Sequence, residues 1–358
     1  MTQSAQEPAF RLPDDTTALK VAVLGAGSWG TTFAKVLADS ARHRGDDGTQ
    51  ITLWARREAV AQEITQEHRN SQYLPEIELP SLLTATSDLN EAVRDAHVVV
   101  VAVPAQQVRA TLLEVKDALD PAVVVVSLVK GLERGTDARM SELCAEVLEL
   151  PPARFAVVSG PNLALEIARE EPTATVIASA HEPTAALLVS RTSAPYFRPY
   201  TNTDVPGVEI GGIVKNVIAL AVGICDGQGL GDNSKASVIT RGLTETTRLA
   251  ARLGANAETL SGLAALGDLV ATCASPLSRN RSAGRLLGQG LTTAEVSEQM
   301  SQTAEGIKSV SAVVDLARRV GVEMPISEAV NAVVNGQLDV RSIAGLLLAR
   351  DLKPEGPQ

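Results

Sequence analysis

The sequence predicts two domains of different class: an N-terminal α/β domain built on a doubly wound, mainly parallel sheet, and an all-α C-terminal domain. Short apolar runs alternate with helical segments through the first part of the chain, and the first run ends on a glycine-rich turn. Beyond about Thr201 these strand-like runs vanish, and Ala-, Leu- and Val-rich segments with helical period follow. With 358 residues, 45% of them hydrophobic, the chain is long enough to bury two cores.

The domain boundaries follow from these changes in composition. Met1 to Ala18 is polar and lacks the apolar segment of a secretory signal, so it is expected to form a disordered tail. Lys353 to Gln358 is polar and contains proline, which predicts a second tail. The expected divisions are 1–18 for the first tail, 19–203 for the α/β domain, 204–350 for the helical domain and 351–358 for the second tail.

Charge and cysteine content exclude several classes of partner. A net charge of −10 argues against nucleic acid and anionic membranes, which bind basic surfaces. The three cysteines lie far apart without a CxxC pair, so neither a disulfide framework nor a structural zinc is expected. Val98–Val103 is too short to span a bilayer, and Ile213–Cys225 contains a lysine. We therefore expect a cytoplasmic protein with no metal, no nucleic-acid partner and no membrane insertion.

The elements of the first domain can be placed in chain order. Lys20 to Leu24 is a β-rich apolar run, and Trp29 to Ala38 has the spacing of apolar residues that a helix needs. A polar loop then leads to a second strand at Ile51–Trp54. Further apolar runs lie at His97–Val103, Ala122–Leu128 and Phe155–Val158. Runs that are apolar on both faces suit a parallel sheet that helices cover on both sides.

The turn after the first strand, Gly25-Ala26-Gly27-Ser28-Trp29-Gly30, has the GxGxxG spacing. In this motif the first glycine permits a tight turn, the second lets the backbone approach a pyrophosphate, and the third lets the helix pack on the strand. The phosphates then lie at the positive end of the helix. Ordinary loops also contain this spacing, but its place between a strand and a helix, among further strand–helix units, favours a dinucleotide-binding Rossmann domain.

The end of the second strand indicates which dinucleotide binds. An NAD-selective enzyme usually has Asp or Glu there to hold the ribose 2′-hydroxyl, whereas this strand ends Trp54-Ala55-Arg56-Arg57. Two guanidiniums can hold a 2′-phosphate bidentately or stack on the adenine. NADPH is therefore the expected cofactor, with NADH use left open. The alternative is that Arg56 and Arg57 are solvated surface charges.

A helix expected over Val208–Cys225 carries a single charged residue in its interior, Lys215. A solvated helix face would carry more charge. Helical spacing groups this lysine with small residues, on a face that a ligand could approach closely: Gly211, Gly212 and Ala219. Desolvation there favours the neutral amine and lowers the lysine pKa toward a useful acid–base range. Lys215 is the leading catalytic candidate, unless its apolar stem carries the amine to the surface. The four histidines lie in settings typical of surface or structural roles: His43 in a polar loop, His68, His97 and His181.

Three further clusters combine polar groups with glycines. Lys130-Gly131-Leu132-Glu133 and Ser159-Gly160-Pro161-Asn162 leave the carboxyl ends of predicted strands, where ligands bind in open α/β sheets. Ser278-Arg279-Asn280-Arg281 follows Gly267-Asp268. Backbone amides with Lys and Arg suit a small phosphorylated substrate, although turn chemistry explains each cluster alone equally well.

Seven motifs occur in order between about residues 20 and 340: Gly25-Ala26-Gly27-Ser28-Trp29-Gly30-Thr31, Lys130-Gly131-Leu132-Glu133, Ser159-Gly160-Pro161, Gly212-Ile213-Val214-Lys215-Asn216-Val217, Ile239-Thr240-Arg241-Gly242, Gly267-Asp268-Leu269 and Ser278-Arg279-Asn280. Together they resemble the motifs of bacterial NAD(P)-dependent glycerol-3-phosphate dehydrogenase, and the set is far more specific than any one member. The resemblance implies reversible reduction of dihydroxyacetone phosphate to sn-glycerol 3-phosphate, supplying glycerophospholipid synthesis, by a cytoplasmic and often dimeric enzyme.

The resemblance also implies roles for individual residues. Lys215 is then the general acid–base residue at the C2 oxygen. The implied substrate positions are Lys130, Gly160, Asn162, Lys215, Asp268, Ser278, Arg279 and Asn280. The implied cofactor positions are Ser28, Trp29, Arg56, Arg57, Lys130, Ala164, Arg279 and Glu305, beside Gly25, Gly27 and Gly30 of the turn. Asn162 stands where the family pattern has Ser or Thr, and Glu305 is matched on a short segment.

Two other function classes stay open at this point. A related two-domain dehydrogenase, such as a hydroxyacid or ketopantoate-type reductase, would share the glycine turn and a helix lysine. Such an enzyme would have no evident need for the Ser278-Arg279-Asn280 cluster. A non-catalytic sensor would bind NADPH without turnover, and Lys215 would then have no role.

We predict that replacing both Arg56 and Arg57 with Ala raises the KM for NADPH far more than the KM for NADH. Only NADPH carries the 2′-phosphate that the guanidiniums would hold. Steady-state kinetics with each cofactor measure the two KM values, and an equal rise in both would contradict the assignment.

Overall fold

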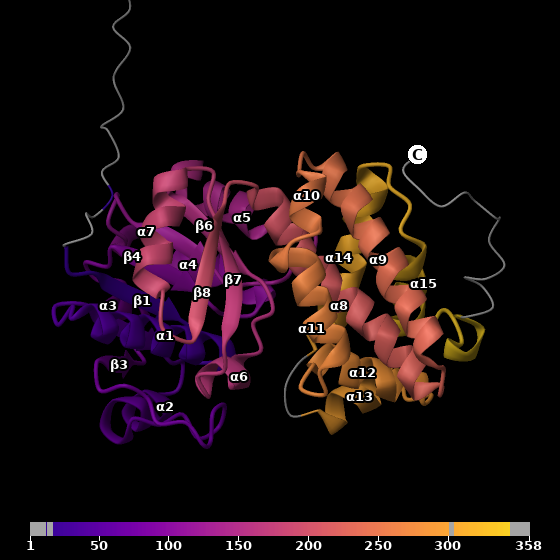
Figure 1. Cartoon of the computed structure of the whole chain (residues 1–358), viewed down its shortest axis with the longest axis horizontal. Helices are drawn as coiled ribbons and strands as arrows, with labels where there is room; N and C mark the ends of the chain where they lie inside the picture. The colour runs from indigo at the N-terminus through magenta and orange to yellow at the C-terminus, as the bar shows by residue number, and fades with distance from the viewer. Residues whose placement is uncertain (1–11, 13–16, 301–303, 344–358) are drawn as a thin grey trace, which may run out of the picture. The chain divides into compact units, whose positions relative to one another are not determined.

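The structure is a computed structural model that describes Leu12, residues 17–300 and residues 304–343. The expected tail at 351–358 lies outside the described residues, as does most of the expected tail at 1–18. The chain divides into two compact units, Met1–Glu133 with Ala138–Glu209 and Arg134–Asp137 with Ile210–Gln358. The strands labelled in Figure 1 all belong to the first unit.

The first unit contains one eight-stranded sheet with the strand order β3-β2-β1-β4-β5-β6-β7-β8. Strands β1 to β6 are parallel, β7 is antiparallel to β6, and β8 is parallel to β7. The doubly wound, mainly parallel sheet that the sequence predicts is thereby confirmed. The bounds are β1 (Lys20–Leu24), β2 (Gln50–Trp54), β3 (Leu83–Thr86), β4 (Val98–Val101), β5 (Val124–Ser127), β6 (Phe155–Ser159), β7 (Thr173–Ala178) and β8 (Phe197–Asn202).

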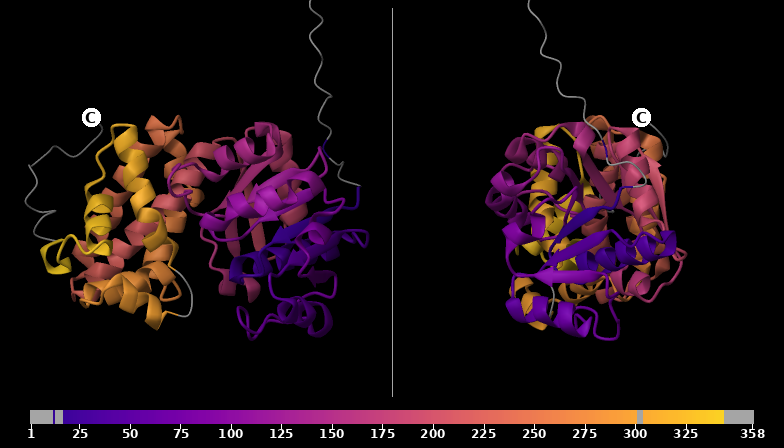
Figure 2. Two further views of the ribbon diagram at one scale, coloured as in Figure 1. Left: turned by 180° about the vertical axis from the view of Figure 1, so that it is seen from behind. Right: turned by 90° about the vertical axis from the view of Figure 1, so that its left-hand side faces the viewer.

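Helices cover both faces of this sheet, as Figure 2 shows from two further sides. They are α1 (Ser28–Arg44), α2 (Glu58–Gln62), α3 (Leu89–Val93), α4 (Val108–Val115), α5 (Met140–Leu148), α6 (Ala164–Ala168) and α7 (Glu182–Thr192). Helix α1 packs against α6 and α7, whereas α4 packs against α3 and α5. The chain adds β2 and β3 on one side of β1, and then β4 to β6 on its other side. Because the crossovers are right-handed, this reversal places the two groups of helices on opposite faces.

Helix α1 begins at Ser28, within the glycine turn, and ends at Arg44, where Gly45 caps it. This glycine has a φ of 68°, the left-handed conformation common after the last helical residue, and its N–H donates to the carbonyls of the last turn. Basic residues in that turn interact favourably with the negative end of the helix dipole. The helix reaches Arg44, beyond the predicted end at Ala38, so His43 lies in the helix and the prediction of a loop there is wrong.

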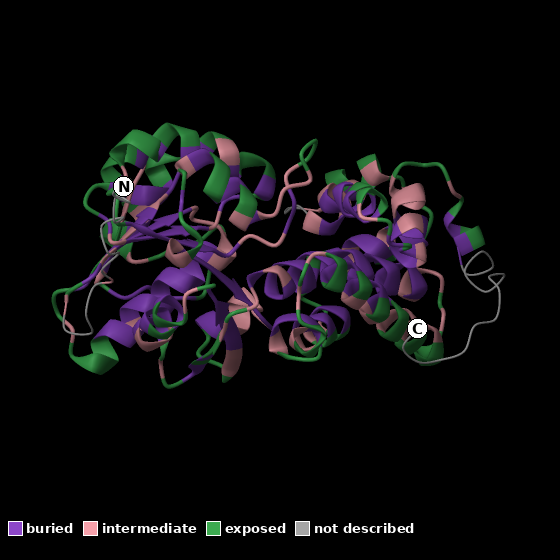
Figure 3. Cartoon of the chain, turned by 90° about the horizontal axis from the view of Figure 1, so that it is seen from above, coloured by how far each residue is buried: buried purple, intermediate pink, exposed green. Residues whose placement is uncertain are grey.

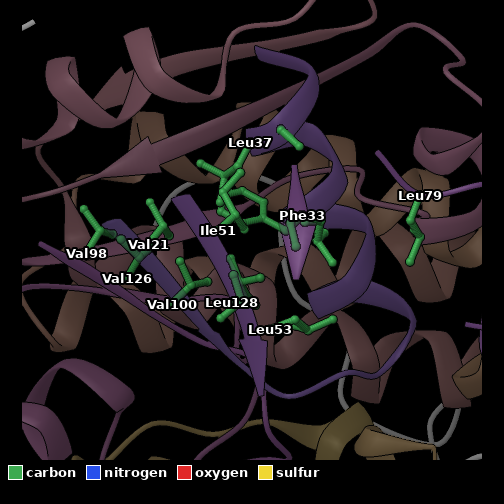
Figure 4. Packing of buried hydrophobic residues seen from close by; sticks show 14 of the residues in the cluster. Val21, Phe33, Leu37, Ile51, Leu53, Leu79, Val98, Val100, Val126 and Leu128 are labelled. Atoms are coloured by element: carbon green, nitrogen blue, oxygen red, sulfur yellow. The ribbon is translucent and has the colours of Figure 1, made fainter. Parts of the chain in front are cut away.

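The core of the first unit lies between the sheet and α1 (Figure 4). Branched aliphatic side chains from four neighbouring strands pack with Phe33 and Leu37 of α1. They include Val21, Ile51, Leu53, Val98, Val100 and Val126. Full burial of each such side chain contributes about 1.5–3 kcal/mol. Figure 3 shows these strands as buried beneath helices with exposed outer faces.

Strands β3, β7 and β8 were not predicted. Strands β3 and β8 are the edges of the sheet, where one face meets solvent and proline is tolerated. Accordingly β3 has one fully buried residue, Leu83, and β8 alternates buried and exposed positions around Pro199. In β7 only the second half is an apolar run, because the strand opens with Thr173-Ala174-Thr175.

The second unit contains helices and no strand among its described residues, which confirms the predicted all-α class. Its helices are α8 (Val205–Gly227, of which the part from Ile210 belongs to this unit), α9 (Asp232–Arg252), α10 (Ala257–Leu260), α11 (Asp268–Ala274), α12 (Arg279–Gly288), α13 (Thr293–Gln299), α14 (Glu305–Arg319) and α15 (Pro325–Val334). A π-helical turn, Leu263–Gly267, leads directly into α11.

Helix α8 is predominantly apolar. By length and composition it could cross a membrane, as could the bent pair Ala257–Ala274 and Arg279–Gly288. However, 94% of the most apolar window of α8 is buried, which is typical of the core helix of a globular unit. The predicted small-residue face beside Lys215 is therefore packed against protein, and that prediction is wrong in part. Ala219 is fully buried and Gly211 packs against Ala265.

Glycines bring α12 unusually close to α8. A Cβ on Gly223 would lie 2.9 Å from the Cα of Gly284, and one on Gly227 would lie 2.8 Å from the Cα of Gly288. Neither contact leaves room for a side chain, so the two backbones touch, as in packed helix pairs with small residues four apart. This contact fixes where the first turn of α12 lies relative to α8.

A buried carboxylate, Glu245, joins α9 to the start of α15. It accepts hydrogen bonds from the backbone N–H groups of Ile326 at 2.7 Å and Ser327 at 3.3 Å, which the end of the helix leaves without intrahelical partners. Burial nevertheless raises the pKa of Glu245 to about 7, above its ordinary value of 4.5, although these donors favour the ionised form. At pH values between these two pKa values, ionisation of Glu245 therefore favours the unfolded chain.

We predict that the wild type loses stability relative to Glu245→Gln as the pH rises from 4.5 to 7. A carboxyl whose pKa is raised by folding contributes stability below its unfolded pKa and loses it as the pH passes the folded pKa. The relative loss in the free energy of unfolding is at most about 3 kcal/mol. Urea denaturation of both proteins at several pH values measures it. Glu114→Gln, at an exposed position, is the control. A difference in the free energy of unfolding between wild type and Glu245→Gln that stays constant with pH would contradict the prediction.

Candidate active site

The glycine turn between β1 and α1 has a separate structural reason for each glycine. Gly25 has a φ of 124°, and a Cβ there would lie 2.8 Å from the carbonyl oxygen of Ala102. A Cβ on Gly30 would overlap the carbonyl oxygen of Gly25, so the helix packs directly on the turn. A Cβ on Gly27 would meet nothing within 4 Å. The first and third glycines are thus needed for folding, whereas the second faces open space that a pyrophosphate could approach.

The first turn of α1 offers groups that have no hydrogen-bond partner in the described part of the chain. Gly27 precedes the helix without a side-chain cap, so the first amides of the helix are left to other acceptors. The indole of Trp29 packs edge-on against Phe33, with ring centroids 5.6 Å apart, and its Nε1 is buried without a hydrogen-bond partner among the described residues. Buried donors of this kind are rare in proteins and fit a ligand at this position.

Arg56 and Arg57 lie exposed after the end of β2, which fits both a cofactor contact and the alternative of solvated surface charges. A guanidinium N–H of Arg57 donates to Gln72 Oε1. The nearest acid along the chain is Glu58, whose carboxylate accepts hydrogen bonds from Ser87 and Gln62. No carboxylate therefore takes the usual place of an NAD-selective acid directly after this strand.

The loops after β5 and β6 come together at the carboxyl edge of the sheet. Lys130 Nζ donates to the carbonyl oxygen of Gly160 at 3.1 Å, which joins two clusters that the sequence presented separately. Glu133 holds the first loop through a bidentate ion pair with Arg109, at 2.7 and 2.9 Å. Gly160 has a φ of 152°, which a residue with a side chain rarely adopts.

Asn162 presents an unsatisfied amide in the second of these loops. Its backbone N–H donates to the Gly160 carbonyl at 2.7 Å, but its Oδ1 and Nδ2 are buried without partners among the described residues. Leaving such groups unpaired costs about 1–3 kcal/mol each, so the residue fits a site that a polar ligand completes. Ala164, two residues on, accepts a hydrogen bond from Thr32 of α1 at 3.1 Å, close to the glycine turn.

In the second unit, Lys215 forms a compact cluster with two residues of α11. Its Nζ donates to Asp268 Oδ1 at 2.9 Å and to Thr272 Oγ1 at 2.7 Å. The Lys215 and Asp268 side chains are 10% and 2% exposed, so the pair is almost fully withdrawn from water. The carboxylate stabilises the charged ammonium, an influence that the sequence argument from burial alone did not include.

The Ser278-Arg279-Asn280 cluster forms the start of α12. The hydroxyl of Ser278 caps the helix by accepting from the backbone N–H of Arg281. Asn280 Nδ2 donates to Asn216 Oδ1 at 2.8 Å, and Asn280 Oδ1 accepts from the backbone N–H of Gly306 at 2.8 Å. Because Asn216 follows Lys215 on α8, these contacts join the cluster to the segment of α8 that carries the lysine, within one unit.

Glu305 begins α14, one residue before Gly306. Burial raises its pKa, and the positive charges of Lys308, Arg279 and Arg134 act in the opposite direction. The charge of Arg279 is thus close enough to influence Glu305. The structure places these two residues, both matched to cofactor positions by the resemblance, in one neighbourhood.

Sequence reasoning missed Thr272 and Asn216. A signal was present for Thr272, which lies four residues after Asp268 and so shares its helix face. Two of the four histidines have structural contacts: His97 Nδ1 accepts from the backbone N–H of Lys20, and His181 Nδ1 contacts Thr184 Oγ1. The part of the chain that the structure describes contains no cluster of three His, Cys, Asp or Glu residues that could hold a metal ion.

Comparisons with known proteins agree across nearly the whole chain. A family model described as the N-terminus of NAD-dependent glycerol-3-phosphate dehydrogenase matches residues 20–185, and the model of its C-terminus matches residues 204–345. The glycerol-3-phosphate dehydrogenase (NAD(P)+) of Thermobifida fusca strain YX is 55% identical over 336 residues, covering 94% of this chain and 98% of the relative.

Solved structures give the same result. Glycerol-3-phosphate dehydrogenase from Coxiella burnetii has a TM-score of 0.87 at 37% identity, covering 93% of this chain and 99% of that one. A ketopantoate reductase from Ralstonia eutropha has a TM-score of 0.56 at 18% identity, which is a likeness of fold alone. With both family models matched in order and more than half of the residues shared with a full-length relative, this chain belongs to the family of NAD(P)-dependent glycerol-3-phosphate dehydrogenases.

Proposed function

We propose that this enzyme reversibly reduces dihydroxyacetone phosphate to sn-glycerol 3-phosphate, with NADPH or NADH as the reductant. The observation that supports this most directly is the buried Lys215–Asp268–Thr272 cluster, which lies in the same unit as the Ser278-Arg279-Asn280 cluster. One cluster can move a proton, and the other can hold a phosphate.

Lys215 is the proposed proton donor. When bound, the cofactor supplies the hydride that reduces the C2 carbonyl carbon. The Lys215 ammonium gives a proton to the C2 oxygen as negative charge develops there, and takes the proton back in the reverse direction. The Asp268 carboxylate accepts a hydrogen bond from the ammonium, and Thr272 Oγ1 fixes its direction from a second side. Two fixed contacts leave the third N–H of the ammonium for the substrate oxygen.

The phosphate of the substrate is held by groups at the start of α12. Arg279 supplies a guanidinium, and the first turn of the helix supplies backbone N–H groups at the positive end of its dipole. In the first unit, Lys130 and the Asn162 amide are further proposed substrate contacts. Binding energy from the non-reacting phosphate then positions the carbonyl for reaction.

The cofactor is assigned to the first unit on the open side of Gly27. The turn from Gly25 to Gly30, with Ser28 and Trp29, is proposed to bind the pyrophosphate, and Arg56 with Arg57 the 2′-phosphate. Lys130, Ala164, Arg279 and Glu305 are the remaining proposed cofactor positions. This assignment is supported by the unpaired Trp29 Nε1 and by the absence of an acid directly after β2 among the described residues.

We propose a cytoplasmic homodimer whose product supplies glycerophospholipid synthesis, without membrane insertion or a nucleic-acid partner. The net charge of −10 and the burial of α8 support the last two points. Light scattering on purified protein measures the oligomeric state, and a monomeric mass would contradict the dimer.

We predict that purified protein oxidises NADPH or NADH when dihydroxyacetone phosphate is added, and that unphosphorylated dihydroxyacetone gives at least about a hundredfold lower kcat/KM. Loss of the phosphate removes binding energy that is used for positioning, so kcat falls as well as affinity. Absorbance at the nicotinamide band follows both reactions. Equal turnover of the two ketones would favour the related reductases, and cofactor binding without any turnover would favour a sensor.

We predict that Lys215→Met lowers kcat by at least about a hundredfold, which is the usual contribution of a general acid. Thr272→Val, which removes one of the two contacts of the ammonium, lowers kcat less. Lys116→Met removes an exposed lysine of the first unit and is the control with unchanged kcat. Near-normal turnover by folded Lys215→Met would rule out the proposed role.

A further inference from the structure

A buried asparagine outside the recognised motifs contacts the glycine turn. Asn70 lies between α2 and β3 and has no solvent-exposed surface. Its Nδ2 donates to the carbonyl oxygen of Ala26 at 3.0 Å and to Thr31 Oγ1 at 2.9 Å. Ala26 lies inside the turn and Thr31 in the first turn of α1. One amide therefore joins the turn to the helix that follows it.

The segment around Asn70 is itself held firmly. The backbone N–H groups of Tyr73 and Leu74 donate to the Asn70 carbonyl at 3.1 and 2.8 Å, which closes a tight turn. Leu74 is buried in the core of the unit, and Ser71 N donates to Glu63 at 2.9 Å. The amide of Asn70 is thus presented to Ala26 by a fixed backbone.

The contact to Ala26 determines the direction of the next N–H. In a trans peptide the carbonyl of one residue and the N–H of the next point in opposite directions. By holding the Ala26 carbonyl, Asn70 makes the Gly27 N–H point away from itself. Ala26 has a glycine on each side, and glycine restricts backbone rotation little, so the Ala26–Gly27 peptide plane is not held in one orientation by its own residues. Without Asn70, rotation of the plane could present the Ala26 carbonyl to an approaching anion.

A purely stabilising role does not account for this residue. Asn70 Oδ1 is buried and has no hydrogen-bond partner among the described residues. An unpaired buried acceptor costs free energy, so the side chain is a poor choice for packing alone. What an amide supplies here is a donor that can reach two acceptors, one of them the turn carbonyl.

We propose that Asn70 is a positioning residue for the cofactor: its amide fixes the Ala26–Gly27 peptide so that the Gly27 N–H, and not the Ala26 carbonyl, faces the pyrophosphate. This inference rests on the cofactor site proposed for the glycine turn. It concerns the pyrophosphate, which NADPH, NADH and ADP-ribose share. It does not concern the 2′-phosphate, which is assigned to Arg56 and Arg57.

The test compares ligands that contain the pyrophosphate with one that lacks it. Asn70→Ala is expected to weaken NADPH, NADH and ADP-ribose alike, each by about tenfold, as expected for loss of a hydrogen bond to a charged group. The inhibition constant of 2′-AMP and the KM of dihydroxyacetone phosphate at saturating cofactor stay within about twofold of wild type. Asn70→Asp keeps the side-chain size but lacks the amide donor. If the alanine variant does not fold, the same ligand affinities are measured for Asn70→Asp, with the same expected results.

Ser40→Ala is the matched structural control. Ser40 is fully buried on the same helix and donates to the Ser193 carbonyl at 2.7 Å, so this variant also loses a buried hydrogen bond of α1. It is expected to lower the Tm and leave ADP-ribose affinity unchanged. Equal weakening of 2′-AMP and ADP-ribose by the Asn70 variants, or wild-type affinity for ADP-ribose, overturns the inference. Failure of the wild type to bind any of the three pyrophosphate ligands overturns the proposed cofactor site instead.

Discussion

The second unit is organised around one ion pair, in which the ammonium of Lys215 on the apolar helix α8 is buried against the carboxylate of Asp268. Transfer of such a charge out of water costs on the order of several kcal/mol unless a partner of opposite charge and further hydrogen bonds compensate it. Asp268 and Thr272 supply both for Lys215. They lie one helical turn apart on α11, and the π-helical turn Leu263–Gly267 sets where α11 begins.

The first unit meets a different demand, recognition of phosphate, mainly with backbone. Its turn uses the absence of side chains at Gly25 and Gly30 to bring strand, turn and helix together, and leaves Gly27 open. The unpaired Trp29 Nε1 and Asn162 amide show where folding alone leaves polar groups unsatisfied. Burial without a protein partner is what a site built for a polar ligand shows before the ligand is present.

The sequence was most informative where a pattern has a single physical cause. The glycine spacing after an apolar run predicted the turn between β1 and α1, and a lone charge in an apolar helix predicted the burial of Lys215. Edge strands such as β8 were missed because they bury one face only and tolerate proline. The small-residue face of α8 was predicted to be open to a ligand from the sequence of that helix alone. Gly211 instead packs against Ala265 of another segment, which the sequence of α8 cannot indicate. Asn70 gave no signal, because its partners lie 44 and 39 residues earlier in the chain.

The backbone contact between α8 and α12 limits how the substrate range of this enzyme can be engineered. Where helices meet through side chains, a larger ligand can be admitted by repacking those side chains. Gly223 and Gly227 meet Gly284 and Gly288 with no side chains between them, so nothing at that contact can be trimmed. If the start of α12 holds the substrate phosphate as proposed, a broader specificity there must come from exchanging its side chains, with the helix axis left in place.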